Sequence, residues 1–264
     1  MQMKRKNPIV QEHGPEVAPM DRVVDVHSRV GVGRGFETRR PDQALSEMRR
    51  FGVAVSWICP PDACAAVRNH EGNDYVAGVV ADNRDAFVGC AVANPWYGDE
   101  AVEELGRAFE MGLRVLYLHP SIQGFQISDE IVDPVVVAAQ QRGMPIYVPT
   151  GTPVCAMPYQ LSALARKHRD ARFIMGHMGY ADFWYDAVGA ARGTENIWLE
   201  TSFMDVDIIR DAVKSLGPER VVFGTAAPLA DVGVEIEKLG MLGLPQADFD
   251  KIMYLNARGL MPCE

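Results

Sequence analysis

The segment RVVDVH, residues Arg22–His27, is a short apolar run rich in valine, as expected of a buried β-strand. Seven further runs of this kind follow it along the chain, and helical patterns separate most of them. These runs are Val53–Cys59, Phe87–Ala93, Leu113–His119, Pro145–Val148, Arg172–Gly176, Asn196–Thr201 and Arg220–Gly224.

The intervening segments place apolar side chains at the spacing of one helix face. In Glu100–Met111, for example, Val102, Leu105 and Phe109 fall on one stripe. The other helical segments are Ile131–Arg142, Leu161–His168, Phe183–Ala191, Val206–Leu216, Val232–Leu239 and Asp248–Leu260.

Near-continuous apolar strands that alternate with helices favour a parallel sheet covered on both faces. Eight such units in roughly 240 residues fit a single (β/α)8 TIM barrel, whose usual size is about 250 residues. A doubly wound sheet is the alternative. We therefore expect an α/β protein with one barrel domain over residues 21–264. Residues 1–20, which three prolines and a glycine interrupt, are expected to form a flexible N-terminal arm.

The composition is that of an ordinary globular protein, since 48% of the 264 residues are hydrophobic and 23% are charged. A net charge of −9 argues against nucleic acid or an anionic membrane as a partner. No apolar run reaches the ~18 residues that a membrane span needs. Five cysteines without metal-type spacing indicate a reduced, cytoplasmic setting. We expect a small-molecule substrate, and the acidic, helix-rich exterior is compatible with a homodimer.

In such a barrel the working residues sit at the carboxyl ends of the strands. Asp25, His27 and Arg29 alternate along and just past the first strand, so a period of two puts them on one side. The ends of later strands carry further candidates, which are His119, His177, Glu200 and Thr225.

Six landmarks in order match the pattern of a known family. They are Asp25–Arg29 (DVHSR) at a family Asp-x-His-x-His, Leu118–Pro120 (LHP), Met144–Gly151 (MPIYVPTG), Ile174–Gly179 (IMGHMG), Phe223–Pro228 (FGTAAP) and Asn256–Arg258 (NAR). From about Asp21 to Leu260 the chain thus resembles the amidohydrolase-2 branch of the amidohydrolase superfamily. That resemblance implies a TIM barrel related to metal-dependent hydrolases of lactones and to carboxy-lyases.

The resemblance also implies a zinc-type site built from two strand-one histidines, a strand-five histidine and a strand-eight aspartate. Only His27 survives among these ligands, because the other positions hold Arg29, Pro149 and Ala226. Proline and alanine offer no donor atom, and arginine stays protonated. The sequence therefore predicts that the zinc site is lost and that no cofactor is needed. The alternative is a relocated site formed by His27, His119, His177 and Cys155.

Arg29 is expected to supply, without a metal, a positive charge for a carboxylate, phosphate or enolate, unless it only forms an ion pair with Asp25. With no ion to depress their pKa values, His27, His119 and His177 are expected to act as general acids or bases near neutral pH. Glu200 would orient a histidine or serve as a base. The substrate-binding candidates are Trp96, Tyr117, Trp184 and Thr225.

The favoured function is a metal-independent enzyme of hydrolase or carboxy-lyase type. It would perform hydrolysis, decarboxylation, isomerisation or cyclisation on a small organic acid or cyclic carbonyl compound. One alternative is a catalytically silent relative that binds a ligand or partner. The other is a metallohydrolase with a relocated metal site.

Overall fold

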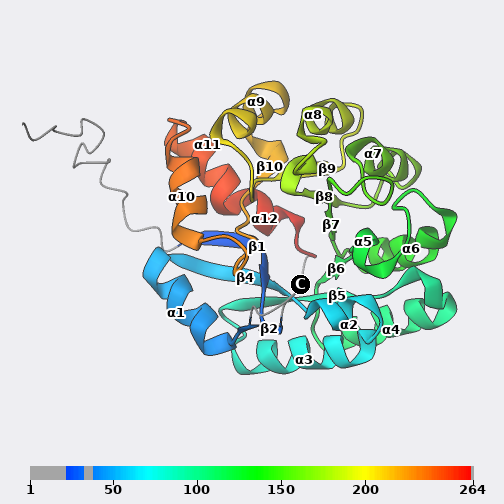
Figure 1. Ribbon diagram of the computed structural model, residues 1–264. Helices are drawn as coiled ribbons and strands as arrows, with labels where there is room; N and C mark the ends of the chain where they lie inside the picture. Colours follow the sequence, from blue (N-terminus) through cyan, green and yellow to red (C-terminus); the bar gives the residue numbers. More distant parts are fainter. Residues whose placement is uncertain (1–21, 33–37, 263–264) are drawn as a thin grey trace, which may run out of the picture.

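The computed structural model describes residues 22–32 and 38–262, and in this part of the chain eight parallel strands form one sheet. Figure 1 shows the sheet curled around a central axis with the helices outside it. Neighbouring strands of the sheet follow chain order, and they are β1 (Val23–Arg29), β4 (Val53–Cys59), β5 (Phe87–Val92), β6 (Val115–Tyr117), β7 (Ile146–Pro149), β8 (Phe173–Gly176), β9 (Ile197–Glu200) and β10 (Val221–Val222).

Hydrogen bonds between the last and first strands close the sheet. Val26 N donates to Phe223 O at 3.0 Å, and Ala226 N donates to His27 O at 2.8 Å. The architecture is therefore a single (β/α)8 barrel, as the sequence predicts, and the doubly wound alternative is wrong. A short antiparallel pair, β2 (Gly31–Val32) and β3 (Thr38–Arg39), follows β1.

The helices occupy the connections between strands, where a parallel sheet requires crossovers. They are α1 (Pro41–Phe51), α2 (Asp62–Ala66), α3 (Asn69–Asp82), α4 (Asp99–Glu110), α5 (Pro120–Gln123), α6 (Asp133–Gln141), α7 (Pro158–Lys167), α8 (Trp184–Arg192), α9 (Val206–Leu216), α10 (Val232–Gly240), α11 (Gln246–Asp250) and α12 (Asn256–Leu260). Shorter 3-10 turns are η1 (Pro95–Tyr97), η2 (Glu130–Val132), η3 (His177–Gly179) and η4 (Pro218–Arg220), and the π-helical turn η5 (Lys251–Leu255) joins α11 to α12.

All eight strands and the seven helical segments expected from the sequence are present, with ends that differ by a few residues. The segment Asp248–Leu260 is not one regular helix, because η5 interrupts it. Helices α1 to α3 were not anticipated. The expected arm, residues 1–20, lies outside the described residues. Within residues 22–32 and 38–262, no helix combines the length and the apolar character that crossing a bilayer demands.

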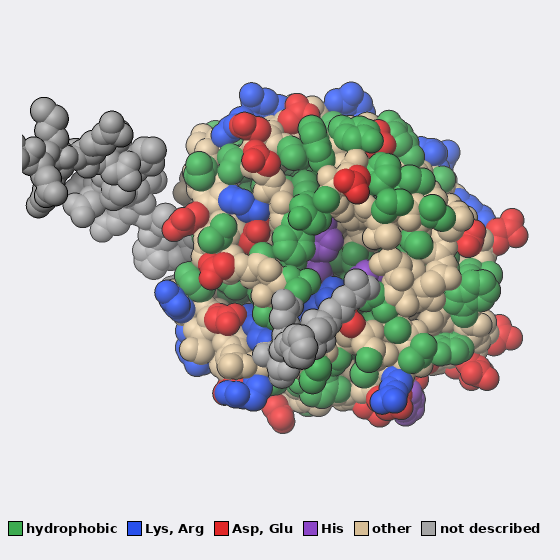
Figure 2. All heavy atoms as spheres, viewed as in Figure 1, with side chains coloured by type: hydrophobic (Ala, Val, Ile, Leu, Met, Phe, Trp, Pro, Cys, Tyr) green, Lys and Arg blue, Asp and Glu red, His purple; other side chains and the backbone are tan. Residues whose placement is uncertain are grey.

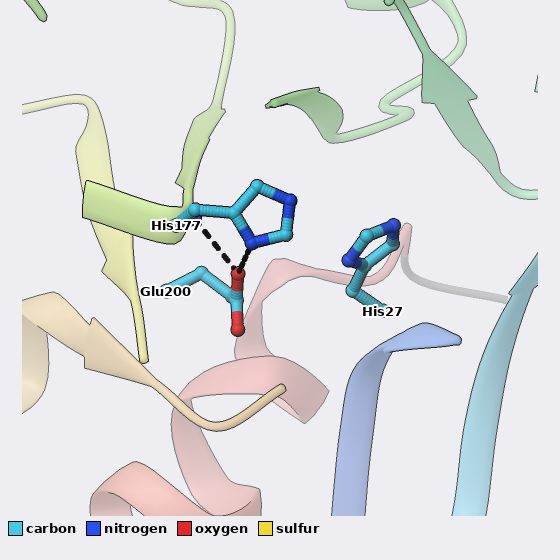
Figure 3. Close-up of side chains that lie close together, drawn as sticks. All are labelled: His27, His177 and Glu200. Atoms are coloured by element: carbon cyan, nitrogen blue, oxygen red, sulfur yellow. Dashed lines mark hydrogen bonds and ion pairs between the residues drawn. The ribbon is translucent and has the colours of Figure 1, made fainter. Parts of the chain in front are cut away.

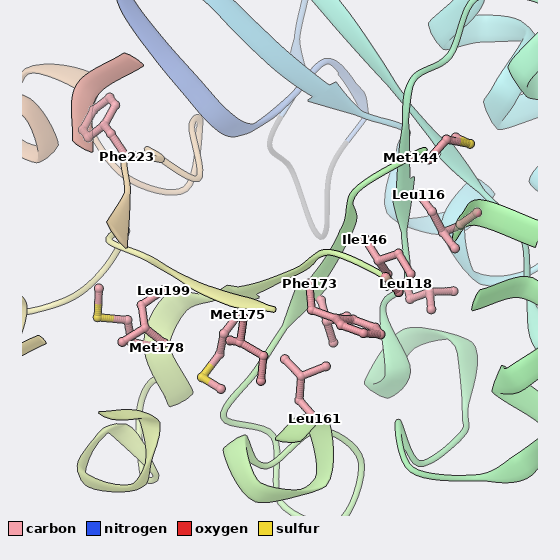
Figure 4. Packing of buried hydrophobic residues seen from close by; sticks show 14 of the residues in the cluster. Leu116, Leu118, Met144, Ile146, Leu161, Phe173, Met175, Met178, Leu199 and Phe223 are labelled. Atoms are coloured by element: carbon pink, nitrogen blue, oxygen red, sulfur yellow. The ribbon is translucent and has the colours of Figure 1, made fainter. Parts of the chain in front are cut away.

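Strand residues alternate between two cores. On β6, Tyr117 points into the barrel, while Leu116 and the following Leu118 pack outward against the helices. On β7, Tyr147 points inward and Ile146 outward. Figure 4 shows this outer layer between strands and helices. The outer layer holds the barrel together, so the inward positions near the strand ends are free to carry polar and aromatic side chains.

Candidate active site

The predicted site residues gather at the carboxyl end of the barrel. Figure 2 looks onto this face and shows a hollow near the barrel axis, with histidine side chains at its base. Arg29, His119 and His177 are 8%, 9% and 9% exposed, so each keeps a small part of its surface accessible. His27 and Glu200 are fully buried. The site thus has an accessible tier and a buried tier beneath it.

Several residues that directly follow the strands, near this hollow, have a positive backbone φ angle. His177 and Met178, after β8, have φ values of 61° and 43°. Phe203, after β9, has φ of 63°, and Ala226, after β10, has φ of 57°. Non-glycine residues rarely adopt this left-handed region, which costs about 1–3 kcal/mol each, and such residues cluster at functional sites.

Glu200, the last residue of β9, organises one side of the site. Its Oε2 accepts hydrogen bonds from Tyr147 Oη (2.8 Å), His177 N (2.9 Å) and Ser202 Oγ (2.9 Å). Its Oε1 accepts from Ser202 N at 2.6 Å. Figure 3 shows the carboxylate beneath the His177 ring. A carboxylate accepts about four hydrogen bonds, so Glu200 is saturated. Of the two roles considered for Glu200, its contacts match the orienting one.

These bonds determine which nitrogen of His177 carries a proton. Ser202 Oγ lies 2.7 Å from His177 Nδ1, and its single hydrogen is donated to Glu200. The hydroxyl must therefore accept from His177 Nδ1–H. The Nε2 atom of His177 is then unprotonated and available as a hydrogen-bond acceptor or general base.

Arg29, at the end of β1, is held from two sides. Its Nη1 donates to Asp62 Oδ1 at 2.8 Å, and its Nη2 donates to Tyr117 Oη at 3.0 Å. The alternative in which Arg29 forms an ion pair is met, but with Asp62 and not with Asp25. Asp62 is the partner because α2 starts directly after the Pro60–Pro61 turn that follows β4, and this turn brings its carboxylate to the barrel mouth.

Asp25 serves a different role, joining β1 to the loop after β10. Its carboxylate accepts from Thr225 N (2.9 Å), Thr225 Oγ1 (2.7 Å) and His27 N (3.0 Å), and from Ser56 Oγ at 3.3 Å. Burial raises the pKa of Asp25 to about 6, although these hydrogen bonds oppose the shift. Thr225, expected to bind substrate, is fully buried against Asp25.

His27 lies among rings and has no hydrogen-bond partner for either ring nitrogen within the described residues. Its ring stacks on Tyr147 with centroids 4.4 Å apart, and the centroids of His177 and Tyr117 lie 5.1 and 6.0 Å away. Burial, followed by the charges of His177, Arg29 and His119, holds the pKa of His27 well below its usual value.

The prediction that these histidines titrate near neutral pH needs correction for two of them. Burial lowers the pKa of His177 to about 4, and nearby Arg29 lowers it too, while Glu200 opposes the shift. His27 and His177 are therefore neutral at pH 7. They can accept a proton there, but they hold none to donate as imidazolium.

His119 and two tryptophans complete the predicted set. His119 follows β6, reaches the hollow, and has its Nδ1 3.1 Å from Ser121 Oγ. Trp96 is 60% exposed and donates to Gly124 O at 3.0 Å. Trp184 is exposed and lines a pocket of about 290 Å³ between α8 and α9. The structure thus places Trp96 in η1 and Trp184 at the start of α8, both exposed, and the rings that pack on His27 are other ones.

Other aromatic side chains stand near the base instead. The Phe203 ring lies 5.1 Å from the His177 ring, and Tyr180 stacks on Phe203 at 5.2 Å. Phe203 is not among the substrate-binding candidates given from the sequence above. Ser202 and Phe203 follow Glu200, which ends a predicted strand, by two and three residues. That closeness to a strand end is the sequence signal that could have identified both.

Tyr147 and Asp62 were also missed. Tyr147 alternates with outward-facing neighbours on β7, a pattern that places it inside the barrel. Asp62 follows the end of β4, so it meets the same strand-end criterion that selected His119. Asp62 lies outside the family landmarks quoted from the sequence. Tyr147 lies within one of them, Met144–Gly151, but attention there went to Pro149 at the position of a metal ligand.

Three buried residues approach closely enough to hold a metal ion. Ligand atoms of His27, His177 and Glu200 lie within 4.8 Å of one another. Two histidines and a glutamate are a known donor set for catalytic zinc. The relocated site that was the alternative in the sequence shares His27 and His177 with this cluster, whereas its other two residues, His119 and Cys155, are not part of it. The loss of the metal site therefore remains a prediction.

A cavity of about 670 Å³ opens at the opposite end of the barrel. It is lined by Arg22, Val24, Trp57 and Arg258 among others, at the amino ends of the strands. The strained strand ends, the histidines and Arg29 all lie at the other end, so we place the chemistry there.

Comparison with solved structures shows the same fold in several enzymes. A 5-carboxyvanillate decarboxylase from Sphingomonas paucimobilis gives a TM-score of 0.71 at 17% identity, covering 90% of this chain and 98% of that chain. A 2,6-dihydroxybenzoate decarboxylase from Rhizobium gives 0.72 at 18% identity, covering 91% and 98%. A dihydroxybenzoic acid decarboxylase from a Polaromonas species, with bound manganese and the inhibitor 2-nitroresorcinol, gives 0.73 at 18% identity, covering 91% and 97%.

No match was found among curated proteins. A family model described as Amidohydrolase matches residues 1–262, nearly the whole sequence. This match agrees with the barrel and with the strand-end landmarks of the sequence. The chain belongs to the amidohydrolase family.

Proposed function

We propose that this protein is an enzyme that performs acid–base chemistry on a small organic acid or cyclic carbonyl compound without a metal ion. The reaction classes that fit are hydrolysis, decarboxylation, and isomerisation or cyclisation. The observation that carries the proposal is the hydrogen-bond chain from Glu200 through Ser202 to His177, because it leaves His177 Nε2 as a base at the hollow.

Each accessible residue has a role that its contacts allow. His177 would accept a proton from the substrate or from water. Arg29 would bind the anionic group of the substrate, since its guanidinium keeps N–H donors beyond the two given to Asp62 and Tyr117. His119 would be the second proton carrier, as its position at the hollow suggests. The His27 ring lies next to the His177 ring, with centroids 5.1 Å apart, and would hold that ring in place by packing against it.

The hydrogen-bond inventory supports chemistry without a metal. Glu200 would have to give up some of its four hydrogen bonds to bind an ion, and His177 Nδ1 is used by Ser202. Arg29 is close enough to lower the pKa values of His27 and His177, and its fixed charge would also repel a dication. Manganese prefers oxygen-rich sites, which this cluster does not offer.

A substrate screen with chelation tests the proposal. Hydroxybenzoates, of the kind named for the structural neighbours, and small lactones would be incubated with protein treated with a strong chelator. We expect turnover to survive chelation and to fall at least about 100-fold in His177→Ala, the scale of general acid–base catalysis. His70→Ala is the matched control, because His70 is an exposed histidine on α3. Equal activity of His177→Ala and wild type would contradict the proposal.

A second candidate is a zinc enzyme that uses His27, His177 and Glu200. The close approach of their ligand atoms favours it, together with the two unpartnered nitrogens of His27. Elemental analysis of the purified protein separates the two candidates. Stoichiometric zinc that disappears in His27→Phe would support the zinc enzyme, and substoichiometric metal would support the metal-independent one.

A further inference from the structure

Two tyrosines lie side by side inside the barrel and hold opposite sides of the site. Tyr117 on β6 pairs in register with Tyr147 on β7, and their ring centroids are 5.9 Å apart. Both side chains are fully buried, so neither touches a ligand in the hollow. Sequence reasoning assigned Tyr117 to substrate binding, and its complete burial behind Arg29 argues against direct contact.

The two hydroxyl groups are used in opposite ways. Arg29 has only donors, so the Tyr117 oxygen accepts the hydrogen bond from Nη2. Glu200 accepts from every one of its partners, so the Tyr147 hydroxyl donates to it. Tyr117 is therefore bonded to the cation of the site, Arg29, and Tyr147 to its anion, Glu200.

His27 joins the two tyrosines into one aromatic layer. Its ring stacks on Tyr147 at an interplanar angle of 27° and lies nearly parallel to Tyr117 at 28°. The layer sits directly beneath the accessible tier, since the His27 and His177 rings are 5.1 Å apart. Because the rings of this layer pack on one another, the layer fixes the distance between Arg29, bonded to Tyr117, and Glu200, bonded to Tyr147.

We infer that Tyr117 and Tyr147 are positioning residues with separate tasks: Tyr117 orients the Arg29 guanidinium for anion binding, and Tyr147 holds Glu200 and, through Ser202, the tautomer of His177. This inference rests on the proposed function, in which Arg29 binds the anionic group and His177 is the base. It deepens that function, because it predicts that ligand binding and base chemistry can be damaged independently.

Each task has a direct physical reason. A guanidinium that is held by Asp62 and Tyr117 loses little conformational entropy when it binds a carboxylate. Removal of the Tyr117 hydroxyl leaves only Asp62 to orient it. The Tyr147 hydroxyl is one of three donors that fix the position of Glu200 Oε2, so its removal leaves the carboxylate less firmly placed for the hydrogen bond from Ser202.

Two measurements that need no turnover test the inference. The first is the Kd of benzoate, a simple anionic probe, determined by isothermal titration calorimetry. The second is the pair of ¹⁵N chemical shifts of the His177 ring in histidine-labelled protein, with His177→Gln to assign the signals. Both would be measured on wild type, Tyr117→Phe and Tyr147→Phe, which differ from wild type by one oxygen atom each.

We expect a double dissociation. Tyr117→Phe should weaken benzoate binding about tenfold, as loss of one charged hydrogen bond implies, and leave the His177 shifts at their wild-type values. Tyr147→Phe should move those shifts toward a mixture of tautomers and change the benzoate Kd less than about twofold.

The result that would overturn the inference is a shared response. If both tyrosine variants change both the benzoate Kd and the His177 shifts, the two tyrosines have only a general structural role. If Tyr117→Phe leaves the Kd unchanged and Tyr147→Phe leaves the shifts unchanged, the two residues do not have the tasks assigned to them. Absence of benzoate binding by the wild type would also overturn it. Thermal unfolding followed by circular dichroism establishes that each variant is folded. Failure of the proposed function is seen separately, as absence of turnover in a protein that still shows the dissociation.

Discussion

The accessible and buried tiers of the site differ in how completely their polar groups are satisfied and in what they can do. Arg29, His119 and His177 each keep a small exposed fraction, and Arg29 and His177 retain donor or acceptor capacity for a ligand. Glu200 lies beneath them, fully buried and saturated with hydrogen bonds. His27 is buried, and its ring nitrogens have no hydrogen-bond partner in the part of the chain that the structure describes. The contrast teaches that location at a strand end does not by itself make a residue reactive.

Glu200→Gln should have the largest effect on stability. The NH2 group of the glutamine would face Tyr147 Oη, His177 N and Ser202, which all donate to Glu200 in the wild type. The substitution would also remove the negative charge that these donors stabilise. We expect the free energy of unfolding to fall by about 3–5 kcal/mol, the usual cost of breaking a buried charged network. Urea denaturation measures it. A loss below about 1 kcal/mol would show that Glu200 is not the saturated centre of the buried tier.

The pH dependence of stability should reveal His177. Its pKa is about 4 in the folded protein and 6.5 in the unfolded chain, so the unfolded state binds the proton first as pH falls. The resulting stability is fully present above pH 6.5 and is lost as pH falls through this range to about 4. The contribution amounts to about 3 kcal/mol.

Comparison with His177→Gln isolates this contribution. Asp25, whose pKa is raised to about 6, shifts stability in the opposite direction over part of the same range. It is present in both proteins and cancels in their difference. The stability gap between wild type and variant should therefore shrink as pH falls from 7 to 4, and a gap that stays constant would contradict a buried neutral His177.

His27→Phe should have the smallest effect and the opposite sign. The His27 ring is buried among aromatic rings without a hydrogen bond, a state that costs about 1–3 kcal/mol. A phenyl ring removes this penalty but adds volume, so we expect a gain of about 1 kcal/mol in a thermal or urea unfolding experiment. A clear loss of stability would mean that the His27 nitrogens bind an ion or water, and it would favour the zinc candidate.

Much of the fold could be predicted because it depends on local pattern. Valine-rich runs such as Val23–Arg29 and Val53–Cys59 predict strands without knowledge of their partners. Their alternation with helices then limits the topologies to a few, because parallel strands need crossover connections. Of the candidate site, the strand-end positions of His27, Arg29 and His177 followed from the same reasoning.

The contacts within the site could not be predicted, because they depend on the pairing register of the strands and on the course of the loops that follow them. Whether Arg29 meets Asp25 or Asp62 is decided by a turn of a few residues after β4, and no periodicity reports its direction. The tautomer of His177 depends on Ser202, which follows another strand. Depressed histidine pKa values come from burial, and a sequence does not state how deep a side chain lies.

The sequence by itself determined the eight-stranded barrel and the membership of the amidohydrolase family. Those conclusions rest on side-chain identity and on spacing along the chain, which folding does not change. Only the tertiary structure decided that Arg29 pairs with Asp62 and that His27 lies under the site. Such contacts join residues on different strands, so they exist only once the barrel has closed.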